Sequence, residues 1–94
     1  MQFLFLLDLN GAQLTSEQLE LMASERAQSQ SLYGAEVVRQ VWSRADKPGA
    51  CMIVEAADSD SAMTSIQSLP LVNCGALKAT QIPLRAYSGF LPPK

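Results

Sequence analysis

Hydrophobic and polar residues alternate at the start of the chain, and the pattern predicts a strand over residues 2–9. One face of this strand is wholly apolar, with Phe3, Phe5, Leu7 and Leu9. The other face is polar at its ends and apolar at its centre, with Gln2, Leu4, Leu6 and Asp8. We therefore expect a strand buried on both sides. Asp8 interrupts the stretch and no basic residue precedes it, so it does not resemble a signal peptide.

Helical periodicity follows over residues 16–33. Thr15 or Ser16 is a suitable N-cap, and Gly34 is a suitable residue to end the helix in the left-handed conformation. At about 100° per residue, one broad face of this helix is apolar, with Leu19, Leu21, Met22, Leu32 and Tyr33. Glu25 falls on the same face, with Arg26 beside it. An acid and a base on the inward arc of a helix are unusual, and they mark this region as a candidate for chemistry.

The remainder of the chain predicts a hairpin, a short helix and a last strand. Residues 36–44 and 50–57 alternate like strands, and "ADKPG" between them forms a turn, so 36–56 is a hairpin. A short helix then begins among residues 58–60 and is stopped by Pro70. Residues 76–87 form the last strand, in which Pro83 indicates a sheet edge or a bulge. Residues 88–94 form an irregular tail.

This order of elements predicts a single domain over residues 1–94 with the ferredoxin-like β-α-β-β-α-β fold. Such an α+β fold has a four-stranded antiparallel sheet with two helices on one face. The uncovered face would here be too apolar for water, and 48% of the residues are hydrophobic, more than one small core needs. Two sheets packed face to face would bury this surface, so we expect a homodimer of the dimeric α+β barrel type.

Composition excludes several classes of function. The net charge is −2 and no basic cluster is present, which argues against a nucleic-acid-binding role. The absence of histidine excludes haem ligation by histidine and zinc sites of the Cys/His type. No segment approaches the roughly 20 apolar residues of a membrane-spanning helix. Cys51 and Cys74 lack CxxC spacing, and we interpret them as reduced thiols of a cytoplasmic protein.

Two blocks of sequence resemble the muconolactone isomerase family. The first, "ERAQSQSLYG" (25–34), has a glutamate nine residues before a glycine. The second, "VWSRADKPGACMIVEAADSDSAMTSIQSLPL" (41–71), has Trp42 close to Arg44, a hairpin, an acidic strand end, a short helix and "LPL". The resemblance covers most of the chain. It implies a dimeric α+β barrel whose dimers can assemble further into a ring, and an isomerase that moves a double bond in a small unsaturated lactone without a metal or organic cofactor.

The reaction that the resemblance implies gives candidate roles to six residues. Glu25 matches the helix glutamate of the family by its distance from Gly34, and burial of its carboxyl group would suit proton transfer. Arg39 and Arg44 are candidates to clamp a substrate carboxylate. Tyr33, Trp42 and Tyr87 are candidates to line the substrate pocket. Each residue also has an ordinary alternative role, namely a helix glutamate paired with a cation, solvated strand arginines and packed aromatic residues.

Two further functions fit the same fold. One is a cofactorless monooxygenase or cyclase of secondary metabolism, although such enzymes often use the histidine that this chain lacks. The other is a non-catalytic module for small-molecule binding or assembly, favoured because "LRAYSGF" (84–90) has no counterpart of the family's terminal His-Pro pair. The apolar "LPL" at 69–71 also has two interpretations. It packs against a neighbouring subunit, or it seals the short helix onto its own sheet.

Overall fold

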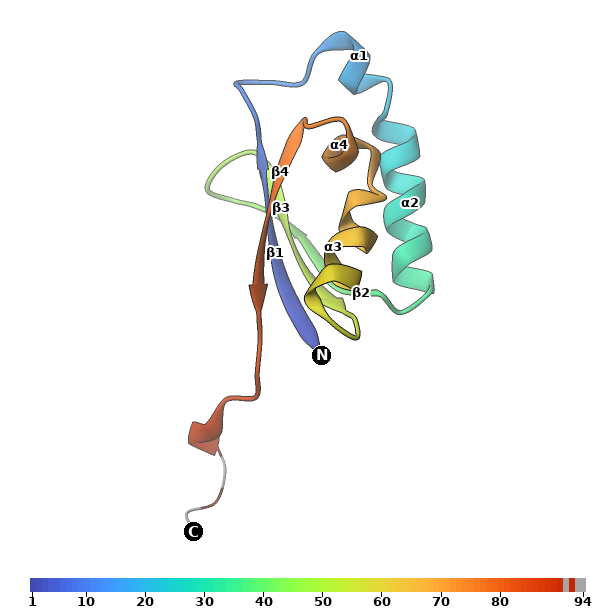
Figure 1. Ribbon diagram of the computed structural model, residues 1–94. Coiled ribbons are helices and arrows are strands. Elements are labelled where there is room, and N and C mark those ends of the chain that lie inside the picture. The colour runs from blue at the N-terminus through green and yellow to red at the C-terminus, as the bar shows by residue number, and fades with distance from the viewer. Residues whose placement is uncertain (91, 93–94) are drawn as a thin grey trace.

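The computed structural model describes residues 1–90 and 92 and contains a four-stranded antiparallel sheet in the order β2-β3-β1-β4 (Figure 1). The strands are β1 (Gln2–Leu9), β2 (Val38–Ser43), β3 (Gly49–Glu55) and β4 (Leu77–Pro83). The helices are α1 (Ser16–Leu19), α2 (Met22–Gly34), α3 (Ser59–Gln67) and α4 (Pro70–Asn73), followed by a 3₁₀ turn, η1 (Ser88–Phe90). This arrangement confirms the predicted ferredoxin-like α+β fold. No helix in the described part of the chain has the length and apolar character needed to cross a membrane.

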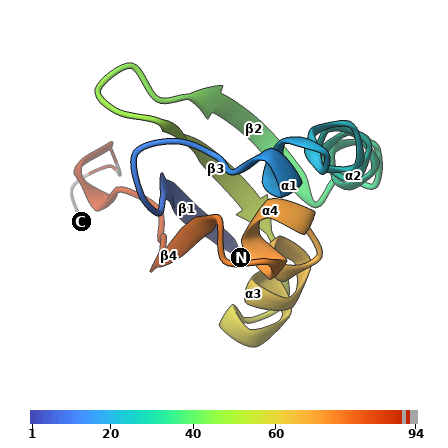
Figure 2. The same ribbon diagram turned by 90° about the horizontal axis from the view of Figure 1, so that it is seen from above.

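The helices cover one face of the sheet, and the core lies between the two layers (Figures 1 and 2). Phe3, Phe5 and Leu7 of β1 are fully buried there, together with Val54 of β3 and Ile66 of α3. No described element covers the opposite face, on which Leu4, Leu6, Cys51 and Ile53 are partly exposed. The expectation that β1 is buried on both sides is therefore met on one side only within a single chain.

The helix predicted over residues 16–33 is two helices. Thr15 caps α1 as expected, and its side chain accepts a hydrogen bond from the Gln18 N–H. The helix then breaks at Glu20 and Leu21, where the Leu21 N–H donates to the Gln18 carbonyl oxygen at 3.0 Å. Neither glycine nor proline stands at the break, so no local sequence signal marks it. The change of direction leaves Leu19 56% exposed, contrary to its predicted inward position.

The end of α2 also differs from the prediction. Gly34 is the last residue of the helix rather than the residue beyond it, and Ala35 is the C-cap. Glu36 takes the left-handed conformation instead, with φ of 63°. Its carbonyl oxygen accepts a hydrogen bond of 2.7 Å from Arg39 Nε, which helps to hold this turn. Tyr33, predicted on the inward face, is 62% exposed at this end of the helix.

A β-bulge in β2 changes which residues share a face. Val38 pairs with Val54 and Gln40 pairs with Ile53, so Arg39 is an extra residue in the strand. The bulge shifts the alternation by one position, and Val38 and Val41 therefore face the helices together. Without the bulge, simple alternation would place these two valines on opposite faces. Trp42, which pairs with Cys51, lies on the open face and is 51% exposed.

The segment after α3 contains a helix that was not predicted. Asp58 caps α3 as expected, with its side chain accepting from the Ser61 N–H at 2.8 Å, but α3 ends at Gln67. Pro70 occupies the first turn of α4, where its missing N–H costs nothing. Leu69 is fully buried and Leu71 is 4% exposed within their own chain, which favours the second interpretation of "LPL". Strand β4 lies at a sheet edge, which is one of the two interpretations of Pro83, but it spans Leu77–Pro83 and is shorter than the predicted 76–87.

Gly49 is predicted to be essential for the sheet. Its φ is 148°, and an added Cβ atom would collide with the Leu7 carbonyl oxygen of the neighbouring strand. Gly49→Ala should therefore lower the free energy of unfolding by about 2–4 kcal/mol, measured by chemical denaturation. Gly34→Ala is the matched control, because helical Gly34 has nothing within 4 Å of its added Cβ. The control should be neutral or slightly stabilising. Equal losses in the two variants would contradict this account.

Candidate active site

A pocket of about 340 Å³ lies between helix α2 and the covered face of the sheet. It is at the end of the sheet where β1 ends and β4 begins, since Leu9 and Leu77 pair there and both line it. Its wall is mostly apolar and comes from every layer of the fold, with Leu7, Met22, Val41, Met52, Leu71 and Leu77 among its lining residues. The polar side chains of the lining are Glu25, Ser29 and Ser43. This is the size and character of a small-molecule site.

Glu25 is the acidic group of this pocket. It is 9% exposed, and no other charged residue among those that the structure describes is buried. Its Oε1 accepts a hydrogen bond of 2.9 Å from the main-chain N–H of Leu71. Leu69, the N-cap of α4, provides no side-chain hydrogen bond, so the carboxylate of Glu25 satisfies an N–H that the short helix cannot. The contact fixes the carboxyl group on the pocket wall and ties α2 to α4.

Burial raises the pKa of Glu25 above its ordinary value, and the hydrogen bond from Leu71 partly opposes this effect. A carboxyl group with a raised pKa can both accept and return a proton more readily near neutral pH. Because Leu71 engages Oε1, Oε2 is the oxygen that a ligand can meet. Ser29 follows Glu25 by one helical turn, so its hydroxyl lies on the same side of α2 and can hydrogen-bond to a ligand.

The five residues predicted to bind substrate do not line this pocket. Tyr33 and Arg39 do come together, but in a separate hollow of about 350 Å³ beside the β2 bulge. Val38, which also lines this hollow, pairs with Val54, and Val54 pairs with Phe3. The hollow is therefore at the opposite end of the sheet from Leu9. The contact of Tyr33 and Arg39 with a substrate at Glu25 stays a prediction.

Arg44 is held by acidic partners near the tip of the β2–β3 hairpin. It forms ion pairs with Asp8 and, at 2.7 Å, with Asp46. The hydrogen bond from Arg44 lowers the pKa of Asp46. Lys47 adds a second cation to Asp8 at 3.2 Å. These ion pairs fasten the hairpin to the end of β1, and they already engage the guanidinium that was expected to clamp a substrate carboxylate.

Trp42 and Tyr87 lie on surfaces that a single chain leaves open. Trp42 is on the uncovered face of the sheet, away from the pocket. Tyr87 is 70% exposed and packs edge-to-face on Phe90, with ring centroids 4.9 Å apart. It belongs to the segment that continues beyond β4 away from the helices (Figure 1). This segment leaves the sheet at the Phe3 end, far along the strands from Leu9 and the pocket.

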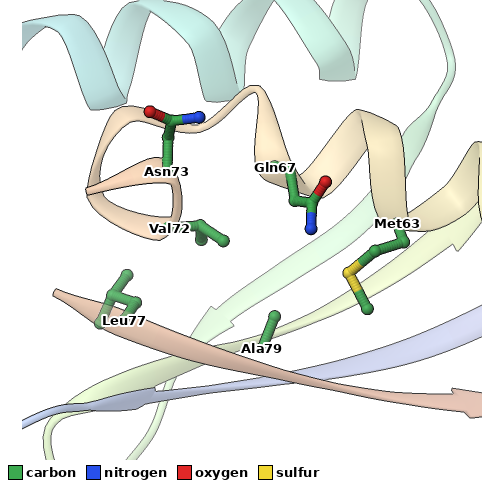
Figure 3. A pocket seen from close by; sticks show the side chains of 6 residues that line it. All are labelled: Met63, Gln67, Val72, Asn73, Leu77 and Ala79. Atoms are coloured by element: carbon green, nitrogen blue, oxygen red, sulfur yellow. The ribbon is translucent and has the colours of Figure 1, made fainter. Parts of the chain in front are cut away.

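A second hollow, of about 510 Å³, lies between α3, α4 and the edge strand β4 (Figure 3). Met63, Gln67 and Val72 extend towards Leu77 and Ala79 of the strand. Its lining contains amide groups, Gln67 and Asn73, but no ionisable side chain. Although it is larger, it offers no group for acid–base chemistry, so we assign the site to the Glu25 pocket. Within residues 1–90 and 92, no three His, Cys, Asp or Glu side chains are grouped so that they could hold a metal ion.

Three polar groups of the site were not identified from the sequence. Ser29 and Ser43 are common residue types without a motif, although the position of Ser29 four residues after Glu25 was available as a signal. The Leu71 N–H belongs to the backbone and depends on a helix that begins at Pro70. The proline itself was a usable signal, because it favours the first turn of a new helix as much as it stops an old one.

Comparison with known proteins gives a consistent result. The profile of the muconolactone delta-isomerase family matches residues 1–88. A crystal structure of muconolactone isomerase is similar, with a TM-score of 0.78 and 16% identity, covering 100% of this chain and 98% of the other. The 5-chloro-2-hydroxyhydroquinone dehydrochlorinase of Burkholderia phenoliruptrix, in complex with 2,5-dihydroxybenzoquinone, has a TM-score of 0.74 and 15% identity, covering 95% and 98%. A search of curated protein sequences found no significant match.

Burial of Glu25 predicts a specific pH dependence of stability. Its pKa is raised in the folded chain, so folding makes ionisation of this carboxyl group less favourable. Below the ordinary glutamate range the group is protonated in both states and this cost is absent. As the pH rises through the folded pKa, the cost appears and the free energy of unfolding falls. Glu25→Gln can still accept from the Leu71 N–H but carries no charge. It should therefore be more stable than wild type at pH 8, on the order of 1 kcal/mol, and this gain should disappear near pH 4.

Denaturant unfolding over pH 4–8 would measure this difference. Glu20→Gln is the matched control, because it removes the same charge from an exposed position of the same region. Its stability relative to wild type should vary little with pH. A constant difference between Glu25→Gln and wild type across the range would show that Glu25 is not desolvated in solution.

Proposed function

The chain belongs to the muconolactone delta-isomerase family, and from this premise we propose that it moves a double bond within a small unsaturated lactone or a related metabolite. Glu25 would remove a proton from a carbon next to the activated carbonyl system. The electrons of that C–H bond would shift through the conjugated system, and Glu25 would return the proton to another carbon. Atoms and charge balance within the substrate and Glu25, so the step requires no metal or organic cofactor.

One observation carries this proposal, namely a buried carboxyl group with a raised pKa on the wall of an apolar pocket. An isolated carboxylate in such a place costs stability, and acids of this kind occur more often at functional sites than elsewhere. The Leu71 N–H orients one oxygen of Glu25. The apolar wall reduces hydration of the other, which strengthens its action as a base. The hydroxyls of Ser29 and Ser43 are available to stabilise charge that develops on the substrate oxygen.

The similarity to a dehydrochlorinase favours a second reaction of the same type. That protein is described as acting on a chlorinated hydroxyhydroquinone and is bound to a dihydroxybenzoquinone. If the substrate carried chlorine on the carbon next to the acidic one, the electrons of the broken C–H bond would form a double bond and expel chloride. Glu25 would then release its proton to solvent rather than return it to a second carbon. Both reactions use one base and differ in the substrate. A non-catalytic binding module, or a monooxygenase or cyclase, are the alternatives if no lactone reacts.

The uncovered face of the sheet supports a homodimer. Leu4, Leu6 and Ile53 occupy its centre, and ion pairs of Asp8 lie at one end. A second copy packed on this face would remove that apolar surface from water, as in the dimeric α+β barrel. Tyr87 could contact a pocket only in another copy, because its own segment leaves the opposite end of the sheet. The free thiols Cys51 and Cys74 suit the cytoplasm as the site of the reaction.

Glu25→Gln is expected to abolish isomerisation. The variant retains the size and polarity of the side chain but has no basic oxygen, so kcat should fall by about a hundredfold or more. The assay follows double-bond migration by absorbance or proton NMR with a panel of unsaturated lactones, each as the free acid and as an uncharged ester. Glu20→Gln should retain wild-type activity. Near-full turnover by Glu25→Gln would exclude Glu25 as the base, and inactivity of wild type towards the whole panel would favour the binding module.

Leu6→Glu is expected to break the dimer. Leu6 lies on the central strand in the middle of the open face, and burial of a carboxylate between two sheets is unfavourable. Light scattering coupled to size exclusion should give a dimer or larger assembly for wild type and a folded monomer for the variant. Ser24→Glu, on the exposed side of α2, is the control and should not change the assembly. A stable wild-type monomer at micromolar concentration would remove the basis for the barrel.

A further inference from the structure

Helix α2 holds the segment between α3 and α4 at two points. One is the contact in which Glu25 Oε1 accepts from the Leu71 N–H at 2.9 Å. The other lies three residues further along α2, where Gln28 Nε2 donates to the Ser68 hydroxyl at 2.9 Å. Residues three apart lie on the same side of a helix, so both contacts are directed at one short segment, from Ser68 to Leu71.

The Ser68 hydroxyl is fully used in this arrangement. It donates to the Ser65 carbonyl oxygen at 2.6 Å and accepts from Gln28, so its donor and an acceptor position are both engaged. Ser68 is also the C-cap of α3, and its main-chain N–H returns to the Ser65 and Ile66 carbonyl oxygens. Gln28 therefore binds the residue at which α3 ends, and it binds a hydroxyl whose direction is fixed.

The segment between the two contacts is short and stiff. Leu69 is fully buried in the core, and Pro70, with its fixed φ, occupies the first turn of α4. Leu69 can therefore act as a pivot, and a stiff segment that turns about a pivot moves at both of its ends. For this reason, a contact that restrains the Ser68 end also restrains the Leu71 end.

We propose that Gln28 is a positioning residue of the site. Through Ser68 it fixes the place of the Leu71 N–H, and through that N–H it fixes the direction of the Glu25 carboxyl group. Among the described residues, Gln28 is not part of the pocket lining, so it acts only through these contacts. The inference rests on the proposed function, because Gln28 affects turnover only if Glu25 is the base.

Gln28→Ala tests the placement of the N–H without turnover. Hydrogen exchange followed by NMR should show the Leu71 amide exchanging severalfold faster than in wild type, because its hydrogen bond opens more often. The pKa of Glu25, from an NMR titration of its carboxyl carbon, should move upwards, since the bond from Leu71 favours the charged form and lowers this pKa. Gln30→Ala, at an exposed position of the same helix, is the matched control and should change neither quantity.

Ser68 provides the second variant. Ser68→Ala should repeat the effects of Gln28→Ala, whereas Ser68→Thr retains the hydroxyl and should behave like wild type. The double variant Gln28→Ala/Ser68→Ala should match either single variant, because both remove the same contact. Additive effects in the double variant would overturn the inference. So would a Leu71 exchange rate and a Glu25 pKa that stay at their wild-type values in Gln28→Ala.

Kinetics connect the contact to the reaction. With a lactone that wild type isomerises, Gln28→Ala should lower kcat about three- to tenfold with little change in KM. Because Glu25 acts in its ionised form, the acidic limb of the kcat profile should move to higher pH. An unchanged kcat beside faster Leu71 exchange would overturn the positioning role. An inactive wild type would reject the proposed reaction, while exchange and titration would still decide whether Gln28 places the Leu71 N–H.

Discussion

The hydrogen bond from the Leu71 N–H to Glu25 Oε1 is the contact on which the site depends. It joins the middle of α2 to the first turn of α4, two helices that are far apart in the sequence. Each partner would be unfavourable alone, since Glu25 is a nearly buried acid and α4 begins with an N–H that no side chain of its cap satisfies. Together they satisfy one another. The same bond sets the direction of the carboxyl group and the position of Leu71 on the pocket wall.

The second constraint is that helices α1 to α4 all lie on one side of the sheet (Figure 2). Alternation along β1 sends Phe3, Phe5 and Leu7 into the core, and sends Leu4 and Leu6 to a face that the chain itself does not cover. The pocket lies on the covered face, between sheet and α2. The chain thus separates two tasks. One face of the sheet forms the core and the ligand site, and the other retains apolar surface for a partner.

The charged groups also fall into two sets, one paired and one unpaired. The ion pairs of Asp8 with Arg44 and Lys47 fasten the β2–β3 hairpin, while Glu25 stands among apolar side chains and accepts only from the backbone. The ion pairs hold the edge of the pocket in place. Burial among apolar side chains raises the pKa of Glu25, because it outweighs the single hydrogen bond.

The sequence by itself determined the order of the strands and longer helices, the β1 core face and the inward position of Glu25. It limited the helix caps to residues 15–16 and 58–60, and Pro83 to a sheet edge or a bulge. These depend on periodicity and on local capping, which neighbouring residues specify. Pro70 is compatible with the end of one helix and with the start of another, and the structure shows the start. The tertiary structure also decided the break at Glu20 and the bulge at Arg39, which no local signal marks and which depend on packing and strand pairing between distant segments. For the same reason, the sequence found the acid of the site but not its surroundings. Ser29, Ser43 and the Leu71 N–H converge on one pocket only when the sheet and helices pack.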